Sequence, residues 1–96
     1  MVFICIKVSF LIFDARSLKD KRSVLKSMIN RMSGKYNISI AEIEENDVIN
    51  KGVIGIGVVG NNWTLCRQVL ELVMKDIEEQ YEIEIHGVEE MESKGY

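Results

Sequence analysis

Several residue types that mark particular classes of protein are scarce or missing in this chain. Among its 96 residues there is no proline, and there are two cysteines and one histidine. Without proline nothing indicates a rigid linker, and we expect residues 1–96 to form a single domain. Cys5 and Cys66 lie far apart and belong to no CxxC pair, so we expect free thiols in the reducing cytoplasm. One histidine without clustered thiols does not make a zinc site, and we expect no bound metal.

Long apolar runs are also missing. The most apolar segment, residues 1–13, is interrupted by Lys7 and is shorter than the roughly 20 residues that a membrane-spanning helix needs. The segment has neither a basic leader nor a small-residue cleavage pattern, so it does not resemble a signal peptide. We therefore expect a cytoplasmic protein with no membrane partner.

Hydrophobic patterns divide the chain into six segments. From Val2 to Ile12 every second side chain is apolar, which is typical of a strand laid on a core. Apolar residues then recur at helical spacing between Ser17, a favourable N-cap, and Gly34, a natural C-cap. The predicted elements are strands at residues 2–13, 36–44, 52–59 and 81–88, a helix at residues 18–33, and a second helix, capped by Asn61 or Asn62, that buries Leu65, Val69, Leu72, Val73 and Ile77.

The order of these segments is strand, helix, strand, strand, helix, strand. It predicts an α+β fold, a ferredoxin-like βαββαβ sandwich with two helices on one face of a four-stranded antiparallel sheet. Right-handed crossovers place the first and third strands in the centre. We expect a bulge near Ala41 to turn Ile43 into the core, and the polar residues 90–96 to form a frayed tail.

Positive and negative charges are separated along the chain. Residues 1–40 carry eight Lys or Arg and two Asp or Glu, a net charge of +6, whereas residues 41–96 carry four and thirteen, a net charge of -9. Several cations fall near the start of the first helix, where the helix dipole disfavours positive charge. Such a cluster is either a solvated helix face or a phosphate-binding site. The candidate phosphate-binding residues are Arg16, Lys19, Lys21, Arg22 and Lys26.

Gly55, Gly57 and Gly60 form a GxGxxG sequence just before the second helix. In a dinucleotide site this motif turns the chain between a strand and a helix, but Val58 and Val59 favour continuation of the strand, so we expect no cofactor. In a central strand, Gly55 and Gly57 would lie on the sheet face without helices, where glycine often marks the close approach of another backbone or a ligand. This open face would then be a homodimer contact, with candidate interface residues Phe3, Phe13, Val53, Gly55, Gly57 and Val59.

Catalysis has one candidate, a pair formed by Cys5 and His86. Both residues fall on the open face of adjacent strands, and a histidine within hydrogen-bonding distance activates a thiol. No third residue is evident that would orient the histidine, so we predict a protein without enzymatic activity. Base stacking on the sheet is not expected, because Phe3 and Phe13 lie at opposite ends of the first strand and the third strand offers glycines.

Residues 15–27, ARSLKDKRSVLKS, resemble the ARSLKEKR-type signature of the YlxP-like proteins, a bacterial family of unknown function. Residues 37–42, NISIAE, are similar to the NVSVAE segment of that family, and residues 57–61 fit its third strand and turn. Asp20 stands where the family pattern usually has glutamate. The resemblance implies a ferredoxin-like fold. It also implies a role near ribosomal RNA, because the family's genes tend to lie near those for transcription, translation initiation and ribosome maturation.

Two main functional hypotheses follow. The first is a non-catalytic RNA- or ribosome-associated accessory protein whose basic first helix binds the phosphate backbone of ribosomal RNA. The second is a homodimeric protein-interaction module that uses the open sheet face. The two hypotheses are compatible because they use different faces. A small enzyme or nucleotide binder is the remaining alternative.

Overall fold

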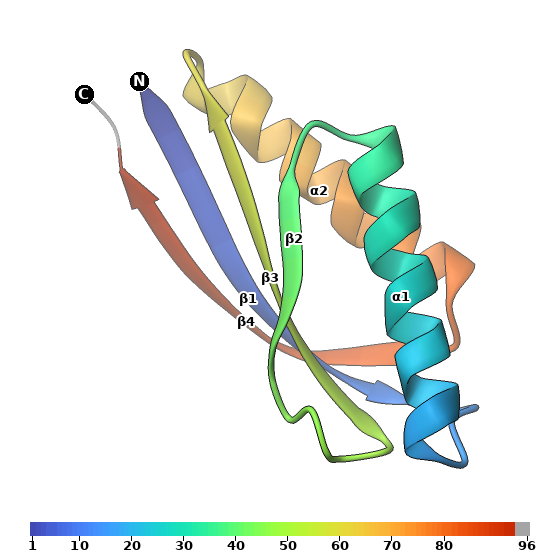
Figure 1. Cartoon of the computed structure of the whole chain (residues 1–96). Helices are drawn as coiled ribbons and strands as arrows, with labels where there is room; N and C mark the ends of the chain where they lie inside the picture. The colour runs from blue at the N-terminus through green and yellow to red at the C-terminus, as the bar shows by residue number, and fades with distance from the viewer. Residues whose placement is uncertain (94–96) are drawn as a thin grey trace.

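The computed structural model describes residues 1–93 as one antiparallel sheet with both helices on the same face (Figure 1). The elements are β1 (Val2–Ile12), α1 (Leu18–Lys35), β2 (Ser39–Glu44), β3 (Lys51–Gly60), α2 (Trp63–Gln80) and β4 (Ile83–Ser93). The strands lie in the order β2-β3-β1-β4, which puts β1 and β3 in the centre. The predicted βαββαβ sandwich and its central strands are confirmed.

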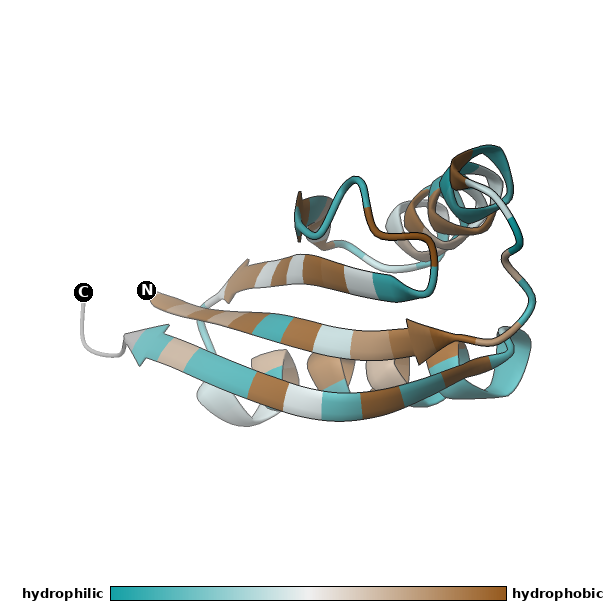
Figure 2. Cartoon of the chain, turned by 90° about the horizontal axis from the view of Figure 1, so that it is seen from below, coloured by the Kyte–Doolittle hydropathy of each residue, from teal (hydrophilic) through white to brown (hydrophobic). Residues whose placement is uncertain are grey.

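β1 forms the middle of the hydrophobic core. It pairs with β3 on one side and β4 on the other, and every second side chain from Val2 to Ile12 is buried. Figure 2 shows β1 as hydrophobic over most of its length, whereas β4 alternates between hydrophobic and hydrophilic residues. The other elements complete one core with Leu25, Met28 and Met32 of α1, Ile54, Ile56 and Val58 of β3, and Cys66, Leu70, Val73 and Ile77 of α2.

α1 extends past its predicted end at Ser33 and through Gly34, the predicted C-cap. The last helical residue is Lys35, and the N–H of the C-cap residue Tyr36 donates to the carbonyl oxygen of Met32 at 2.9 Å. The Lys35 ammonium, at 2.7 Å, and the Tyr36 hydroxyl both donate to the Asp76 carboxylate of α2. These contacts with α2 hold the last turn of α1, so Gly34 lies inside the helix and does not end it.

α2 buries Val73 and Ile77 as predicted, but the rest of its buried stripe differs from the prediction. The second half of α1 lies beside the last turn of α2, where Arg31 donates to Gln80 at 2.9 Å, so the first half of α2 extends beyond the end of α1. Leu65 and Leu72 are consequently 57% and 53% exposed, and their predicted burial is wrong. The buried stripe consists of Cys66, Leu70, Val73 and Ile77.

β4 continues well past its predicted end at residue 88. Glu90 pairs with Ile6 of β1, and Ser93 pairs with Phe3. The prediction of a frayed tail is therefore wrong for residues 90–93, because the ladder with β1 supplies hydrogen-bond partners for their backbone. Residues 94–96 lie outside the described residues.

The bulge expected in the second strand is present, with a different effect. It falls between Glu42 and Glu44 in the pairing of β2 with β3. Ile43 is 46% exposed and lies over β3, with its Cγ2 3.4 Å from the position that a Cβ on Gly55 would take. The bulge thus turns Ile43 onto the open face, and its predicted burial in the core is wrong.

Alanine is expected to have opposite effects at Gly52 and Gly34. A Cβ at Gly52 would lie 2.5 Å from Cζ of the fully buried Phe10, so Gly52→Ala should lower the free energy of unfolding by about 1–3 kcal/mol. No atom lies within 4 Å of a Cβ at Gly34, and Gly34→Ala should raise the free energy of unfolding by about 0.5–1 kcal/mol. Urea unfolding followed by circular dichroism measures both changes. A Gly52→Ala variant that is as stable as the wild type would contradict the packing of Phe10 over Gly52.

Acid should weaken the contact between the helix ends. Hydrogen bonds from Lys35 and Tyr36 lower the pKa of Asp76 below its ordinary value. Its stabilising effect is therefore complete above the unfolded-state pKa and is lost as the pH falls through the lower folded-state pKa. Asp76→Asn should destabilise the protein near pH 7, and the difference from the wild type in urea unfolding should shrink as the pH falls toward about 3. A difference that is constant with pH would show that this carboxylate does not act through its charge.

Candidate functional site

Four exposed cations lie at the start of α1. Arg16 precedes the helix, and Lys19, Arg22 and Lys26 follow at spacings of three and four residues, which place them on one side of it. We call these four residues the basic stripe. None of the four side chains forms an ion pair with any residue of the described part of the chain. The cations that do form ion pairs are Lys7, Lys21, Lys35, Arg67 and Lys75.

Lys21 does not belong with these exposed cations. Its side chain is 1% exposed, and its ammonium donates to the carbonyl oxygen of Glu45 and lies 3.5 Å from Oε2 of Glu42. Glu45 has a φ of 61°, in the left-handed region, so the ammonium holds a tight turn after β2. The predicted phosphate contact of Lys21 is therefore wrong.

Helical spacing in the sequence contains the signal that would have placed Lys21. Lys21 precedes Leu25, Met28 and Met32 by four, seven and eleven residues, and these are the buried positions of α1. Lys21 was grouped with the neighbouring cations because it lies close to them along the chain. The helical period places it on a different side of α1 from them. The basic stripe that remains has four cations.

The backbone amides at the start of α1 are partly occupied. Ser17 Oγ accepts a hydrogen bond from the amide of Asp20 at 3.1 Å, and the Asp20 carboxylate accepts one from the amide of Arg16 at 3.1 Å. This reciprocal capping places a carboxylate at the N-terminus of the helix, where a bound phosphate would otherwise meet free amides. An anion at this site would therefore be held by the side chains of the basic stripe.

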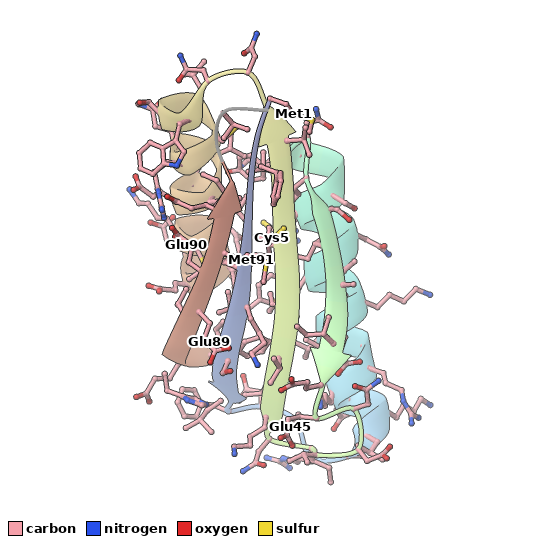
Figure 3. The ribbon with its side chains drawn as sticks, turned by 90° about the vertical axis from the view of Figure 1, so that its left-hand side faces the viewer. Met1, Cys5, Glu45, Glu89, Glu90 and Met91 are labelled. Carbon is pink, nitrogen blue, oxygen red and sulfur yellow. The ribbon has the colours of Figure 1, made fainter. Side chains whose placement is uncertain are left out.

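The second candidate site is the open face, the side of the sheet that carries no helix (Figure 3). It contains a hollow of about 530 Å³ whose floor is β1 and β3, and whose walls include Ile43 of β2 and Met91 of β4. Gly57 lies opposite Cys5 in the sheet, and a Cβ on Gly57 would lie 3.3 Å from the Cys5 Sγ. Gly57 thus makes room for Cys5 of β1. In the same way, Gly55 makes room for Ile43 of β2.

The predicted interface residues are not all available for contact. Phe3 and Val59 pair with each other at one end of the open face, and Val59 is 65% exposed. Val53 is only 5% exposed, so its predicted role as a contact residue is wrong. Phe13 is 58% exposed just past the end of β1, and its assignment stays a prediction. Met91, which is 69% exposed, was missed because the sequence placed it in a tail instead of a strand.

Lys7 is the cation at the centre of the open face. Its ammonium lies 3.0 Å from Glu89 Oε2 of β4 and 3.3 Å from Glu44 Oε1 of β2. To reach Glu44 the side chain crosses β3, where its partner in the sheet is Gly55. Hydrogen bonds to the two carboxylates raise the pKa of Lys7. The charge of Lys7 is therefore neutralised within the chain.

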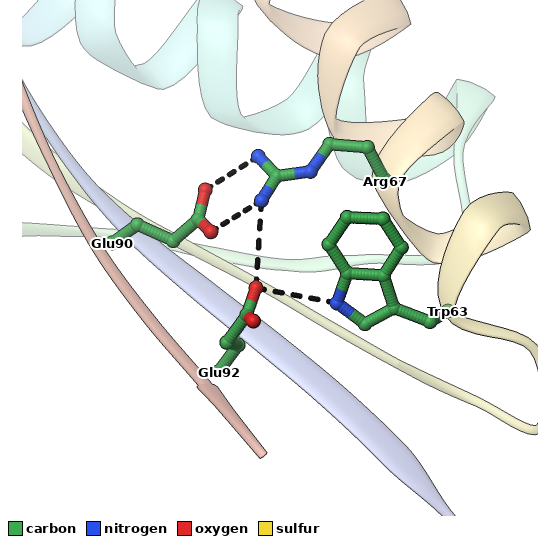
Figure 4. Close-up of polar contacts among 4 residues, drawn as sticks. All are labelled: Trp63, Arg67, Glu90 and Glu92. Atoms are coloured by element: carbon green, nitrogen blue, oxygen red, sulfur yellow. Dashed lines mark hydrogen bonds and ion pairs between the residues drawn. The ribbon is translucent and has the colours of Figure 1, made fainter. Parts of the chain in front are cut away.

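The end of β4 that carries Met91 is held from the opposite side of the sheet (Figure 4). Arg67 of α2 forms two hydrogen bonds with the Glu90 carboxylate, and they lower the pKa of Glu90. Trp63 Nε1 donates to Glu92 at 3.2 Å, and the Arg67 guanidinium lies 5.1 Å from the centre of the Trp63 ring. These contacts bind β4 to α2 and so fix one wall of the hollow.

The candidate Cys5–His86 dyad is wrong. Cys5 pairs with Met91, whereas His86 lies at an irregularity of the ladder beside Ser9 and Phe10. The two positions are five residues apart along β4, or about 16 Å. A hydrogen bond between the histidine and the thiol is therefore impossible in this fold.

The GxGxxG sequence lies entirely within β3. The strand ends at Gly60, and Asn62 caps α2 by accepting a hydrogen bond from the Leu65 amide at 3.1 Å. The predicted continuation of the strand through Val58 and Val59 is confirmed. The glycines thus form no strand-to-helix turn of the kind that holds a pyrophosphate.

Within residues 1–93, no group of three or more His, Cys, Asp or Glu side chains is arranged to hold a metal ion. Neither helix in this range is long and apolar enough to cross a membrane.

Solved structures similar to this chain share its fold at low sequence identity. A de novo designed protein with a ferredoxin fold, LFR1 1, matches with a TM-score of 0.59 and 14% identity, over 99% of this chain and 88% of the other. A second designed protein, Foldit4, matches with a TM-score of 0.55 and 8% identity, over 96% and 99% of the two chains. These similarities confirm the ferredoxin-like architecture and carry no functional information.

Sequence comparison identifies the family. The uncharacterized protein YlxP of Bacillus subtilis is 38% identical over 74 residues, which cover 77% of this chain and 80% of that protein. The model of the family described as "Protein of unknown function (DUF503)" matches residues 3–90. The resemblance to YlxP-like proteins seen in residues 15–27 is thereby confirmed. The chain belongs to the DUF503 family of proteins of unknown function.

Proposed function

We propose that this protein is a non-catalytic RNA-binding accessory protein that contacts phosphate groups through the basic stripe. The observation that carries the proposal is the group of four exposed cations on one side of α1 that have no partner among residues 1–93. Cations without internal partners are free to replace the counterions of a polyanion, and the release of those counterions drives binding. The proposed partner is ribosomal RNA or the ribosome in the cytoplasm, in keeping with the genomic setting that the YlxP-like resemblance implies.

The charge on the rest of the molecule restricts how a polyanion can approach. Residues 41–96, which include most of β2 and all of β3, α2 and β4, have a net charge of -9, whereas residues 1–40 have a net charge of +6. A nucleic acid is therefore repelled from most surfaces and attracted to the side of the molecule that carries α1. This arrangement orients the protein on RNA without base-specific contacts.

The number of cations sets the expected salt dependence. Four phosphate contacts give a slope of log K against log salt of about -3 for single-stranded RNA. Affinity should then fall roughly 50-fold between 50 and 200 mM salt. A protein that recognised bases through neutral hydrogen bonds would lose much less affinity over this range.

Charge reversal of the basic stripe should abolish binding. With Lys19, Arg22 and Lys26 all replaced by Glu, co-sedimentation with ribosomal subunits and total RNA should be lost at low salt. The fold should survive because these side chains are exposed and have no internal partners. Circular dichroism of the variant verifies that the protein is folded.

A pair of double variants separates the effect of the basic stripe on RNA binding from the effect of net charge. Arg22→Glu with Lys26→Glu changes the charge as much as Lys51→Glu with Lys75→Glu, which alters exposed cations on β3 and α2. The first should weaken RNA retention at least tenfold and the second only slightly. Equal losses would contradict a localised site, and undiminished retention by the first variant would remove the proposal.

A further inference from the structure

The open face has both projections and a recess. Met91 and Val59 stand out from it with 69% and 65% of their surface exposed, and between its outer strands lies the hollow of about 530 Å³ over Gly55 and Gly57. Figure 3 looks onto this face and shows Cys5 and Met91 near its middle. A surface with projections and a recess of similar apolar character can complement a copy of itself, as a two-fold symmetric interface requires.

The ammonium at the centre of this face is paired inside each chain, with two carboxylates for its one positive charge. Lys7, the cation at its centre, is already neutralised by Glu44 and Glu89, at 3.3 and 3.0 Å. Covering the face would therefore not bury an unpaired ammonium, which is the usual electrostatic obstacle to an interface. The arrangement also leaves no free cation at the centre of the face to recruit an anionic partner.

The size of the face fits a dimer of moderate strength. β1 and β4 each contain 11 residues and the sheet has four strands. With about 3.3 Å per residue and 4.8 Å between strands, and with allowance for the shorter β2, the face covers roughly 600 Å². Two copies would bury about 1,200 Å² in total, the lower limit of standard protein interfaces.

We propose that the occupant of the open face is a second copy of this chain, packed sheet against sheet about a two-fold axis. The inference is independent of RNA binding, because α1 lies on the opposite layer of the molecule. The dimer would carry its two basic stripes on opposite outer surfaces. One dimer could therefore hold two RNA segments at once and gain avidity that the monomer lacks.

Cys5 reports directly on whether this face is covered. It is exposed and lies within the hollow, whereas Cys66 is buried in the core, so a maleimide should label Cys5 selectively. The experiment combines sedimentation velocity from about 1 to 500 µM protein, a range that brackets the affinity of a small interface, with the rate of Cys5 labelling at each concentration. Both readouts should give the same protein concentration for half-maximal dimerisation. Labelling of Cys5 should slow at least tenfold between the lowest and highest concentrations.

Substitutions on the two layers of the molecule locate the interface. Met91→Glu and Val59→Glu should each raise the protein concentration needed for half-maximal dimerisation at least tenfold, because both side chains project from the open face. Leu72→Glu is the matched control, since Leu72 is 53% exposed on α2, and it should leave this concentration unchanged. Circular dichroism verifies the fold of all three variants.

Three results would overturn the inference. The first is a monomer throughout the concentration range with constant labelling of Cys5. The second is a dimer that Leu72→Glu weakens while Met91→Glu and Val59→Glu do not. The third is a monomer whose Cys5 is protected at every concentration, which would indicate a bound apolar molecule in the hollow instead of a second copy.

Discussion

The fold depends on the burial of one whole side of β1. Six of its side chains, from Val2 to Ile12, are 8% exposed or less, and each buried side chain of this kind contributes about 1.5–3 kcal/mol. A shift of one residue in the pairing would turn all six toward solvent, so the register of β1 with both neighbouring strands is strongly fixed. The composition of the open face follows from this register, because it places Cys5 opposite Gly57 and Lys7 opposite Gly55. The hollow and the neutralised lysine are thus consequences of the core.

Sequence patterns were sufficient where one periodicity dominated. The alternation in β1 and β3 gave the strands, their faces and the order of the elements, and the continuation of β3 through the GxGxxG sequence followed from Val58 and Val59. The patterns failed where contacts distant in sequence decided the outcome. The polar end of β4 is a strand because β1 pairs with it and Arg67 binds Glu90. The last turn of α1 persists because Lys35 and Tyr36 bind Asp76.

The candidate sites were predicted with the same mixture of success and failure. Four of the five cations assigned to phosphate binding are exposed, and the fifth, Lys21, is buried because the helical period places it above Leu25 and Met28. On the open face, Gly55 and Gly57 lie where the strand period put them. A bulge cannot be located from the sequence to a single residue, so Ile43 was assigned to the core although it forms a wall of the hollow.

Lys21 also bears on how the family can diverge. Oε2 of Glu42 is buried without a hydrogen bond, and the Lys21 ammonium at 3.5 Å is its compensating charge. Loss of that ammonium alone would leave a carboxylate uncompensated. The cost would be lower than the about 3–5 kcal/mol of a fully buried pair, because the Glu42 side chain is 22% exposed. A substitution at position 21 should therefore be tolerated better when position 42 changes with it, although the hydrogen bond from Lys21 to the Glu45 carbonyl would still be lost. The side chains of the basic stripe have no such partner among residues 1–93, so this coupling does not constrain them. A lysine retained at position 21 among relatives would thus reflect the requirements of folding.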